Sequence, residues 1–204
     1  MAFSLTKLFD KKPASPIDYL VVGLGNPGKE YEQTRHNMGF MAIDKFALKM
    51  NVKLDRLKWK ALTGTTQVGE KKLLLLKPQT FMNLSGEAVA EAARFYKVPP
   101  ERILVLFDDV SLDVGKLRIR RKGSDGGQKG MRSIIQCMGS EEIPRIKIGV
   151  GAKPHPDYDM AAWVLSHFSK AELKVLEETT DRVAEAVKVI LTEDIGQAMN
   201  RYNG

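Results

Sequence analysis

The sequence predicts an α/β fold: a single domain with a central mixed, mostly parallel β-sheet that is flanked by α-helices on both faces. Short apolar runs of the β type alternate along the chain with segments in which apolar residues recur at helical spacing, which is typical of strands connected by helices. The 204 residues, 43% of them hydrophobic and 28% charged, suffice for one buried core. The single cysteine, Cys137, excludes an internal disulfide framework.

The predicted elements begin after a tail. Residues 1–17 have prolines, lysines and serines without periodicity, so we expect a flexible N-terminal tail followed by one domain over 18–204. Tyr19 to Val22 is an apolar run with the length of a buried strand, and apolar residues recur at helical spacing from Phe40 to Met50. The other elements of the first half are strands at 59–68 and 72–77, a helix at about 84–97 that ends before two prolines, and a buried strand at 103–107.

The second half of the chain begins with a segment of alternating side chains and a glycine-rich turn. Residues 114–122 alternate apolar and basic side chains, which predicts a strand with one basic face. Gly123 to Gly130 is a glycine-rich turn before a short helix that reaches Met138. The remaining predicted elements are a strand at 146–150, a loop at 152–160, an amphipathic helix at about 170–191 and a shorter helix near Gln197.

The net charge of +7 is concentrated in one segment. Residues 116–147 contain nine basic residues and three acidic ones, and this excess predicts a polyanionic partner, with nucleic acid as the first candidate. The alternative is an ordinary solvated basic surface. The nine basic residues are Lys116, Arg118, Arg120, Arg121, Lys122, Lys129, Arg132, Arg145 and Lys147.

No apolar run is long enough to span a bilayer and no signal peptide is recognisable, so we expect a cytoplasmic protein that does not bind membranes.

Gly23 to Gly28 matches the G-x-G-x-x-G pattern of dinucleotide-binding loops and directly follows a predicted strand. That motif also requires a helix that opens on the loop and presents free backbone N–H groups to a pyrophosphate. Here Pro27 removes one donor, and helical periodicity resumes only at about Met38. The context therefore argues against a dinucleotide site.

His36 lies in a polar loop, where a histidine can serve as a general base because the unperturbed pKa of imidazole is near neutrality. The alternative is a loop residue that caps the following helix. For His155 and His167 we favour surface or packing roles, and the wide separation of the three histidines predicts no metal site.

Polar residues also follow two later strands. Asp108 comes directly after a buried strand, where a carboxylate can orient an imidazole, but Asp109 competes for that role and either can be a turn residue. Asn83 can present its amide to a substrate carbonyl or a developing oxyanion, or it can cap the next helix, as Ser85 also can.

Sites in such sheets collect at the carboxyl ends of the strands, so we expect the polar loops after Val22, Lys77 and Phe107 to lie together. The chain has no G-x-S-x-G elbow, and Cys137 falls in an apolar helical stretch. A histidine that activates water is therefore favoured over a covalent nucleophile.

Four segments of the chain form one pattern: Gly23 to Gly28 (GLGNPG), Tyr31 to Phe40 (YEQTRHNMGF), Lys77 to Gly86 (KPQTFMNLSG) and Gly123 to Met131 (GSDGGQKGM). In order and spacing, this pattern resembles the bacterial peptidyl-tRNA hydrolase family, and the resemblance extends over residues 18–202. It implies an enzyme that hydrolyses the ester between a peptidyl group and the 3′-terminal ribose of tRNA. It also implies a cytoplasmic monomer, active without metal or cofactor, that recycles tRNA from prematurely released peptides.

The resemblance assigns roles by position: His36 resembles the catalytic base and Asp108 the aspartate that holds it. The residues that it implies for substrate binding are Asn26, Tyr31, Phe81, Asn83 and Lys129. Those that it implies for binding tRNA phosphate are Arg118, Arg120 and Lys147.

One segment departs from the family pattern. Where this chain has Gly126-Gly127-Gln128-Lys129-Gly130, many relatives have G-G-H-N-G, so Lys129 replaces an asparagine that contacts the peptide or orders water. A lysine cannot accept a hydrogen bond. We therefore expect water positioning to differ at this corner, or Gln128 to share the task.

Two other functions remain open from the sequence. A catalytically silent RNA-binding protein on the same scaffold is one, because chloroplast relatives of the family act in splicing and fold alone does not decide activity. A general esterase for small substrates is the other, although it leaves the basic segment unexplained.

Overall fold

The structure is a computed structural model that describes residues 16–204. Its seven strands are β1 (Tyr19–Gly23), β2 (Arg56–Lys58), β3 (Ala61–Val68), β4 (Lys71–Pro78), β5 (Ile103–Asp109), β6 (Leu117–Arg120) and β7 (Arg145–Gly149). They form one sheet in the order β2-β3-β4-β1-β5-β7-β6. The central strands β4, β1, β5 and β7 are parallel, and β2, β3 and β6 pair antiparallel with their neighbours, so the predicted mixed α/β architecture is confirmed.

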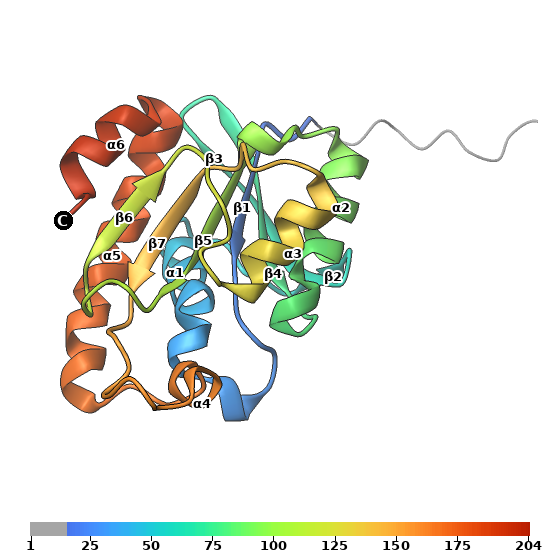
Figure 1. Cartoon of the computed structure of the whole chain (residues 1–204). Helices are drawn as coiled ribbons and strands as arrows, with labels where there is room; N and C mark the ends of the chain where they lie inside the picture. The colour runs from blue at the N-terminus through green and yellow to red at the C-terminus, as the bar shows by residue number, and fades with distance from the viewer. Residues whose placement is uncertain (1–15) are drawn as a thin grey trace, which may run out of the picture.

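Helices cover both faces of the sheet (Figure 1). One face packs against α1 (Met38–Lys49), α5 (Lys170–Thr192) and α6 (Ile195–Tyr202), and the other against α2 (Ser85–Tyr96) and α3 (Lys129–Met138). The short helix α4 (Met160–Val164) lies at the lower side of the view, toward which β1 and β7 point (Figure 1). Four 3₁₀ turns complete the described chain: η1 (Lys29–Tyr31), η2 (Arg35–Asn37), η3 (Met82–Leu84) and η4 (Pro100–Arg102).

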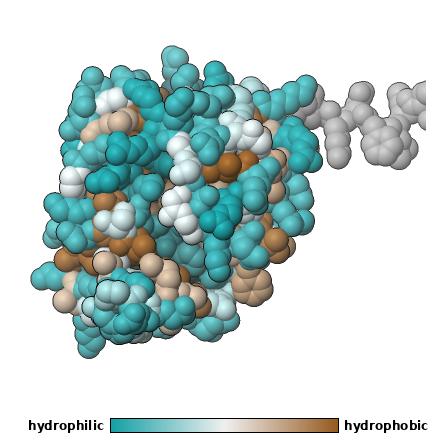
Figure 2. Space-filling view, in the orientation of Figure 1, coloured by the Kyte–Doolittle hydropathy of each residue, from teal (hydrophilic) through white to brown (hydrophobic). Residues whose placement is uncertain are grey.

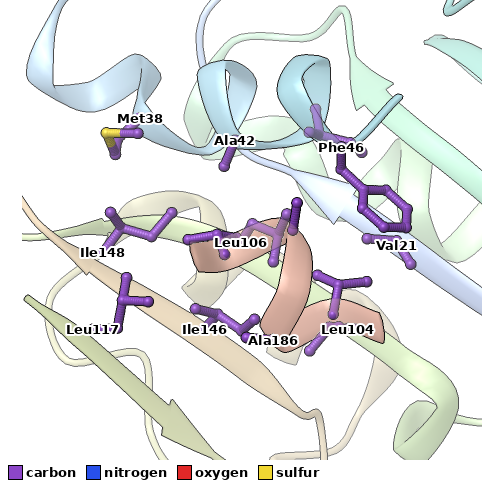
Figure 3. Packing of buried hydrophobic residues seen from close by; sticks show 14 of the residues in the cluster. Val21, Met38, Ala42, Phe46, Leu104, Leu106, Leu117, Ile146, Ile148 and Ala186 are labelled. Carbon is purple, nitrogen blue, oxygen red and sulfur yellow. The ribbon is translucent and has the colours of Figure 1, made fainter. Parts of the chain in front are cut away.

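The sheet separates two apolar clusters because successive side chains of a strand point to opposite faces. Along β5, Leu104 and Leu106 face α1, whereas Val105 and Phe107 belong to the cluster beneath α2 and α3. Figure 3 shows the first cluster, in which side chains of α1 and α5 meet those of β1, β5, β6 and β7. Central strands that are buried on both faces explain why their sequences are continuous apolar runs.

The predicted strand at 59–68 is wrong in its first two residues. Trp59 and Lys60 form a two-residue turn between β2 and β3, with φ angles of 48° and 55°. Such turns favour asparagine and glycine, so these residue types gave no turn signal. Contacts with α2 hold the conformation, because Trp59 packs on Phe95 and Lys60 pairs with Glu87.

Two other expectations need correction. The strand predicted at 114–122 is limited to β6, because the chain before it turns at Gly115 (φ 88°) and makes loop hydrogen bonds with Gly149. Helix α4 was not predicted, since five residues are too short to show a helical period. Of the predicted tail at 1–17, all but Pro16 and Ile17 lies outside the described residues, and Ile17 is buried. No helix in residues 16–204 is long and apolar enough to cross a bilayer.

Arg145 is a basic residue that belongs to the core. Its side chain is buried and donates hydrogen bonds to four carbonyl oxygens, and its burial lowers its pKa. This arginine therefore ties the glycine-rich turn to the sheet and is not available to a ligand, which corrects its place among the nine basic residues. The carbonyls are those of Gly123, Ser124, Glu141 and Ile143.

Replacing Arg145 with leucine should lower the free energy of unfolding by about 3 kcal/mol or more, because it leaves several carbonyls without donors. Urea denaturation measures this loss. Arg120→Leu is the matched control, since Arg120 lies opposite Arg145 in the register of β6 and β7 but is exposed. Equal losses in the two variants would contradict a structural role for Arg145.

Candidate active site

A cavity of about 1020 Å³ opens at the carboxyl ends of β1, β4 and β5. The loop after β1 contributes Asn26 and His36, the segment after β4 contributes Phe81 and Asn83, and the end of β5 contributes Asp108. The loops after Val22, Lys77 and Phe107 thus lie together as expected. Figure 2 shows apolar side chains gathered near α4 on the face of the molecule seen there.

His36 and Asp108 form a hydrogen-bonded pair. The distance from His36 Nδ1 to Asp108 Oδ2 is 2.8 Å, and both residues are buried, at 9% and 4% exposure. A carboxylate only accepts hydrogen bonds, so in the neutral imidazole Nδ1 carries the proton and Nε2 keeps its lone pair. The alternative in which His36 caps the next helix is excluded, because α1 has no side-chain cap.

Close packing of α1 places His36. A Cβ atom at Gly39 would collide with the carbonyl oxygen of Leu106, so only glycine allows α1 to approach the end of β5 this closely. The backbone N–H of Phe40 also donates to the carbonyl of Leu24 at 3.0 Å. The turn η2, which carries His36, is therefore held beside Asp108.

Asp109, the other candidate for orienting the imidazole, has different partners. Its Oδ2 lies 2.9 Å from Lys147 Nζ, and its Oδ1 accepts from the backbone and hydroxyl of Ser111. Burial by itself would raise the pKa of Asp109, but the hydrogen bonds from Ser111 and Lys147 outweigh it and lower that pKa. Strand alternation turns neighbouring carboxylates to opposite sides, which decides between Asp108 and Asp109.

Asn26 is fixed by hydrogen bonds to its backbone and to its side chain. Its backbone N–H and carbonyl bond to the side chain of Asn37, and its Oδ1 accepts from the backbone N–H of Met82 at 2.8 Å. The acceptor Oδ1 is thus occupied. The amide Nδ2 has no partner among residues 16–204, which leaves it as a donor at the cavity wall.

Asn83 and Phe81 lie on the wall supplied by η3. Both are exposed, and Phe81 keeps 57% of its surface accessible. Asn83 does not cap α2, whose N-cap is Leu84 without a side-chain hydrogen bond, and Ser85 bonds to the carbonyl of Met82 instead. Within the described chain the Asn83 amide makes no hydrogen bond and is available to a ligand.

The glycine-rich turn supplies the opposite wall. Gln128 is buried, caps α3 and donates from Nε2 to Asp108 Oδ1 at 3.1 Å. Lys129 is the first residue of α3, is exposed to the cavity and has no ion-pair partner in residues 16–204. The sequence predicted that water positioning would differ at this corner or that Gln128 would share the task. In the structure, the contacts of Gln128 run to Asp108 and to the first turn of α3.

Helix α4 forms a third wall, which Arg35 attaches to the rest of the site. The Arg35 guanidinium stacks 3.8 Å from the ring centre of Trp163, donates to the carbonyl of Val150 and pairs with Glu172 at 2.8 Å. Sequence reasoning overlooked Arg35. The only local signal was the capping box of Ser169 and Glu172 at the start of α5.

The basic residues divide into free and paired side chains. Arg118 and Arg120 project from β6 on its exposed face and make no ion pair within residues 16–204. Arg118 lies opposite Lys147 in the register of β6 and β7, while Lys147 itself pairs with Asp109. The concentrated positive charge predicted for 116–147 is therefore partly neutralised; the other ion pairs are Lys122–Glu142, Arg132–Asp125 and Arg121–Asp194.

Three side chains singled out in the sequence, those of Tyr31, His155 and His167, do not line the cavity. Tyr31 belongs to η1 and is not among the residues that line the cavity. His155 is exposed and packs against Tyr158, and His167 is exposed and pairs its backbone with Thr34. The G-x-G-x-x-G loop leads into η1 and η2 before α1, so no helix opens directly on it.

The chain resembles known proteins over nearly its whole length. The family model described as peptidyl-tRNA hydrolase matches residues 20–204. A peptidyl-tRNA hydrolase of Caldanaerobacter subterraneus is 54% identical over 186 residues, which are 91% of this chain and 100% of that protein. One of Caldicellulosiruptor bescii is 49% identical over 92% of this chain and 98% of that protein. The crystal structure of the Acinetobacter baumannii peptidyl-tRNA hydrolase has a TM-score of 0.85 at 32% identity, covering 93% of this chain and 98% of that one.

The contact between Arg35 and Glu172 predicts that stability depends on pH. Burial would raise the pKa of Glu172, but hydrogen bonds from Arg35 and Ser169 outweigh it and lower that pKa. A lowered carboxyl pKa stabilises the fold above the unfolded value of about 4.3, and this stabilisation is lost as the pH falls through the folded value. Glu172→Gln should therefore reduce the free energy of unfolding at pH 7, with a difference that shrinks below about pH 4.

Urea denaturation at several pH values measures this difference. Glutamine at position 172 still completes the capping box, so the variant removes the charge and spares the helix start. Glu178→Gln, at an exposed position of the same helix, is the control and should show no such dependence. A difference for Glu172→Gln that stays constant with pH would contradict the ion pair.

Proposed function

The chain belongs to the peptidyl-tRNA hydrolase family and hydrolyses the ester bond of peptidyl-tRNA, and we propose that a water molecule activated by His36 makes the attack. The observation that supports this mechanism is the buried hydrogen bond from His36 Nδ1 to Asp108 Oδ2 at the cavity wall. The reaction consumes the ester and one water molecule and yields a peptide carboxyl group and the 3′-hydroxyl of tRNA.

In the first step, Nε2 of His36 removes a proton from water while the hydroxide attacks the ester carbonyl carbon. Asp108 keeps the proton on Nδ1 and stabilises the imidazolium that forms. In the second step the imidazolium gives its proton to the leaving ribose oxygen. His36 thereby returns to its starting state.

Two amides are suited to the charge that develops on the carbonyl oxygen. Asn83 lies on the cavity wall, where its amide makes no hydrogen bond within residues 16–204, and we assign it to the oxyanion. Asn26 presents Nδ2 from a side chain whose Oδ1 is held by the backbone of Met82, so its donor is fixed before substrate binds. We assign Asn26 to positioning the ester.

The cavity walls are suited to the peptide and the terminal nucleoside. The exposed ring of Phe81 offers an apolar surface, and the ammonium of Lys129, unpaired among the described residues, offers a donor to peptide carbonyls. Tyr31, outside the cavity lining, is assigned to the 3′ end of the tRNA. These assignments follow from the resemblance and from the positions of the side chains.

The tRNA phosphates are assigned to the exposed edge of the sheet. Arg118 and Arg120 are exposed on the edge strand β6, and Lys147 lies opposite Arg118. Lys147 must exchange Asp109 for a phosphate, so its contribution to binding is smaller than that of Arg118. We further propose that the enzyme acts as a monomer, in the cytoplasm, and without a metal ion.

His36→Ala should lower kcat by about 10²- to 10⁴-fold, because general-base assistance is lost. The assay follows release of an N-acetylated aminoacyl group from tRNA, with and without EDTA. His155→Ala is the matched control, because His155 is exposed and does not line the cavity. A loss below about tenfold in His36→Ala would remove His36 from the central role.

Arg118→Gln should weaken tRNA binding and reduce the slope of log Kd against log salt by about 0.7 to 0.9, which corresponds to one phosphate contact. Arg56→Gln serves as control, because Arg56 is exposed on β2 at the opposite edge of the sheet. Binding titrations at several salt concentrations give both slopes. An unchanged slope in Arg118→Gln would exclude this phosphate contact.

A further inference from the structure

Gln128 connects the catalytic pair to the start of α3. Its Nε2 donates to Asp108 Oδ1 at 3.1 Å, and the other oxygen of Asp108 accepts from His36. We propose that Gln128 is a positioning residue that holds the Asp108 carboxylate in one orientation and sets the pH range in which His36 acts as a base. This inference rests on the proposed role of His36.

The orientation of the Gln128 amide follows from its contacts. Its Oε1 accepts from the backbone N–H of Met131 at 2.7 Å, an interaction that only the oxygen can make. Nε2 must therefore face Asp108, and it also lies 3.2 Å from Met82 Sδ. Both amide hydrogens of Gln128 are thus directed at protein atoms, so its side chain has no donor left for a catalytic water and keeps only the second lone pair of Oε1.

The consequence for Asp108 is that each of its oxygens has its own donor. A buried carboxylate with one donor can rotate, whereas two donors on different elements fix Oδ2 toward His36. The hydrogen bond from Gln128 also stabilises the negative charge of Asp108 in a site with 4% exposure. Without that donor, the buried pair would retain a proton up to a higher pH, whether on the imidazole or on the carboxyl group.

Gln128 itself cannot titrate, so it supplies this donor at every pH. The other charged groups that line the cavity come from β5, β7, the glycine-rich turn, α3 and the N-cap of α4, and most are paired with one another. Asp109 pairs with Lys147 and Asp125 with Arg132, while Asp159 caps α4 and Lys129 has no ion-pair partner in the part of the chain that the structure describes. Among the cavity-lining residues, only Gln128 donates to the second oxygen of Asp108.

Two substitutions of Gln128 distinguish its hydrogen bond to Asp108 from its role as the N-cap of α3. Gln128→Glu keeps an oxygen for the Met131 N–H but places a carboxylate against Asp108. Gln128→Leu removes both contacts. If Gln128 only capped α3, the glutamate variant would behave like the wild type and the leucine variant would be impaired; a positioning role predicts that glutamate is the more harmful change.

The experiment measures the pH profile of kcat/KM for peptidyl-tRNA hydrolysis, together with the NMR titration of the His36 imidazole. In both variants the acid limb should move to higher pH by about half a unit or more, because a hydrogen bond to a charged group is lost. The plateau should fall by about tenfold in Gln128→Leu and by more in Gln128→Glu, which also places a carboxylate against Asp108. Gln136→Glu is the matched control: it adds the same charge to an exposed position of the cavity wall on α3, and it should leave the acid limb in place.

An acid limb that stays at the wild-type pH in both Gln128 variants would overturn the inference, even if kcat fell. So would a Gln128→Glu variant with wild-type kinetics. The His36→Ala variant distinguishes a failure of the proposed mechanism from a failure of the proposed role of Gln128. If that variant keeps its activity, the proposed mechanism fails; if it loses activity while the Gln128 profiles do not move, only the role of Gln128 fails.

Discussion

The close approach of α1 to the ends of β1 and β5 is the constraint on which the site depends. Gly39 leaves no room for a side chain between the helix and Leu106, and the backbone of Phe40 is bonded to Leu24. This packing brings His36 to Asp108 from a position 72 residues away in the chain. Because both partners are then buried, their hydrogen bond works in a medium of low polarity, where it orients the imidazole more strongly than it would in water.

The basic residues of this part of the sheet are divided between the interior and the surface. Arg145 donates its hydrogen bonds to backbone carbonyls and stabilises the turn that carries Gln128, while Arg118 and Arg120 on the neighbouring strand β6 remain exposed. A general esterase would have no use for such an exposed basic edge. A catalytically silent RNA-binding protein would not require a cavity in which His36, Asp108 and Gln128 are buried and hydrogen-bonded to one another. Burying polar groups costs stability unless each is paired, so this arrangement favours the enzyme.

The sequence predicted most of the fold and the loops of the site, and its errors have physical causes. The turn at Trp59 and Lys60 was missed because contacts with α2, and not local turn preference, hold two residues at positive φ. Helix α4 was missed because Arg35 and a five-residue helix depend on each other across more than a hundred residues. The basic segment was predicted as one surface because a linear count of charge does not register that Arg145 points inward.

The sequence by itself determined the α/β class, the order of most strands and helices along the chain, and the family, because apolar periodicity and motif spacing are local properties of the chain. Only the tertiary structure decided that Asp108 and not Asp109 meets His36, that Asn83 does not cap α2, and that Gln128 faces Asp108. These choices depend on strand pleat, helix approach and the competition of donors for acceptors. They are set by distances between segments far apart in sequence, which no local pattern encodes.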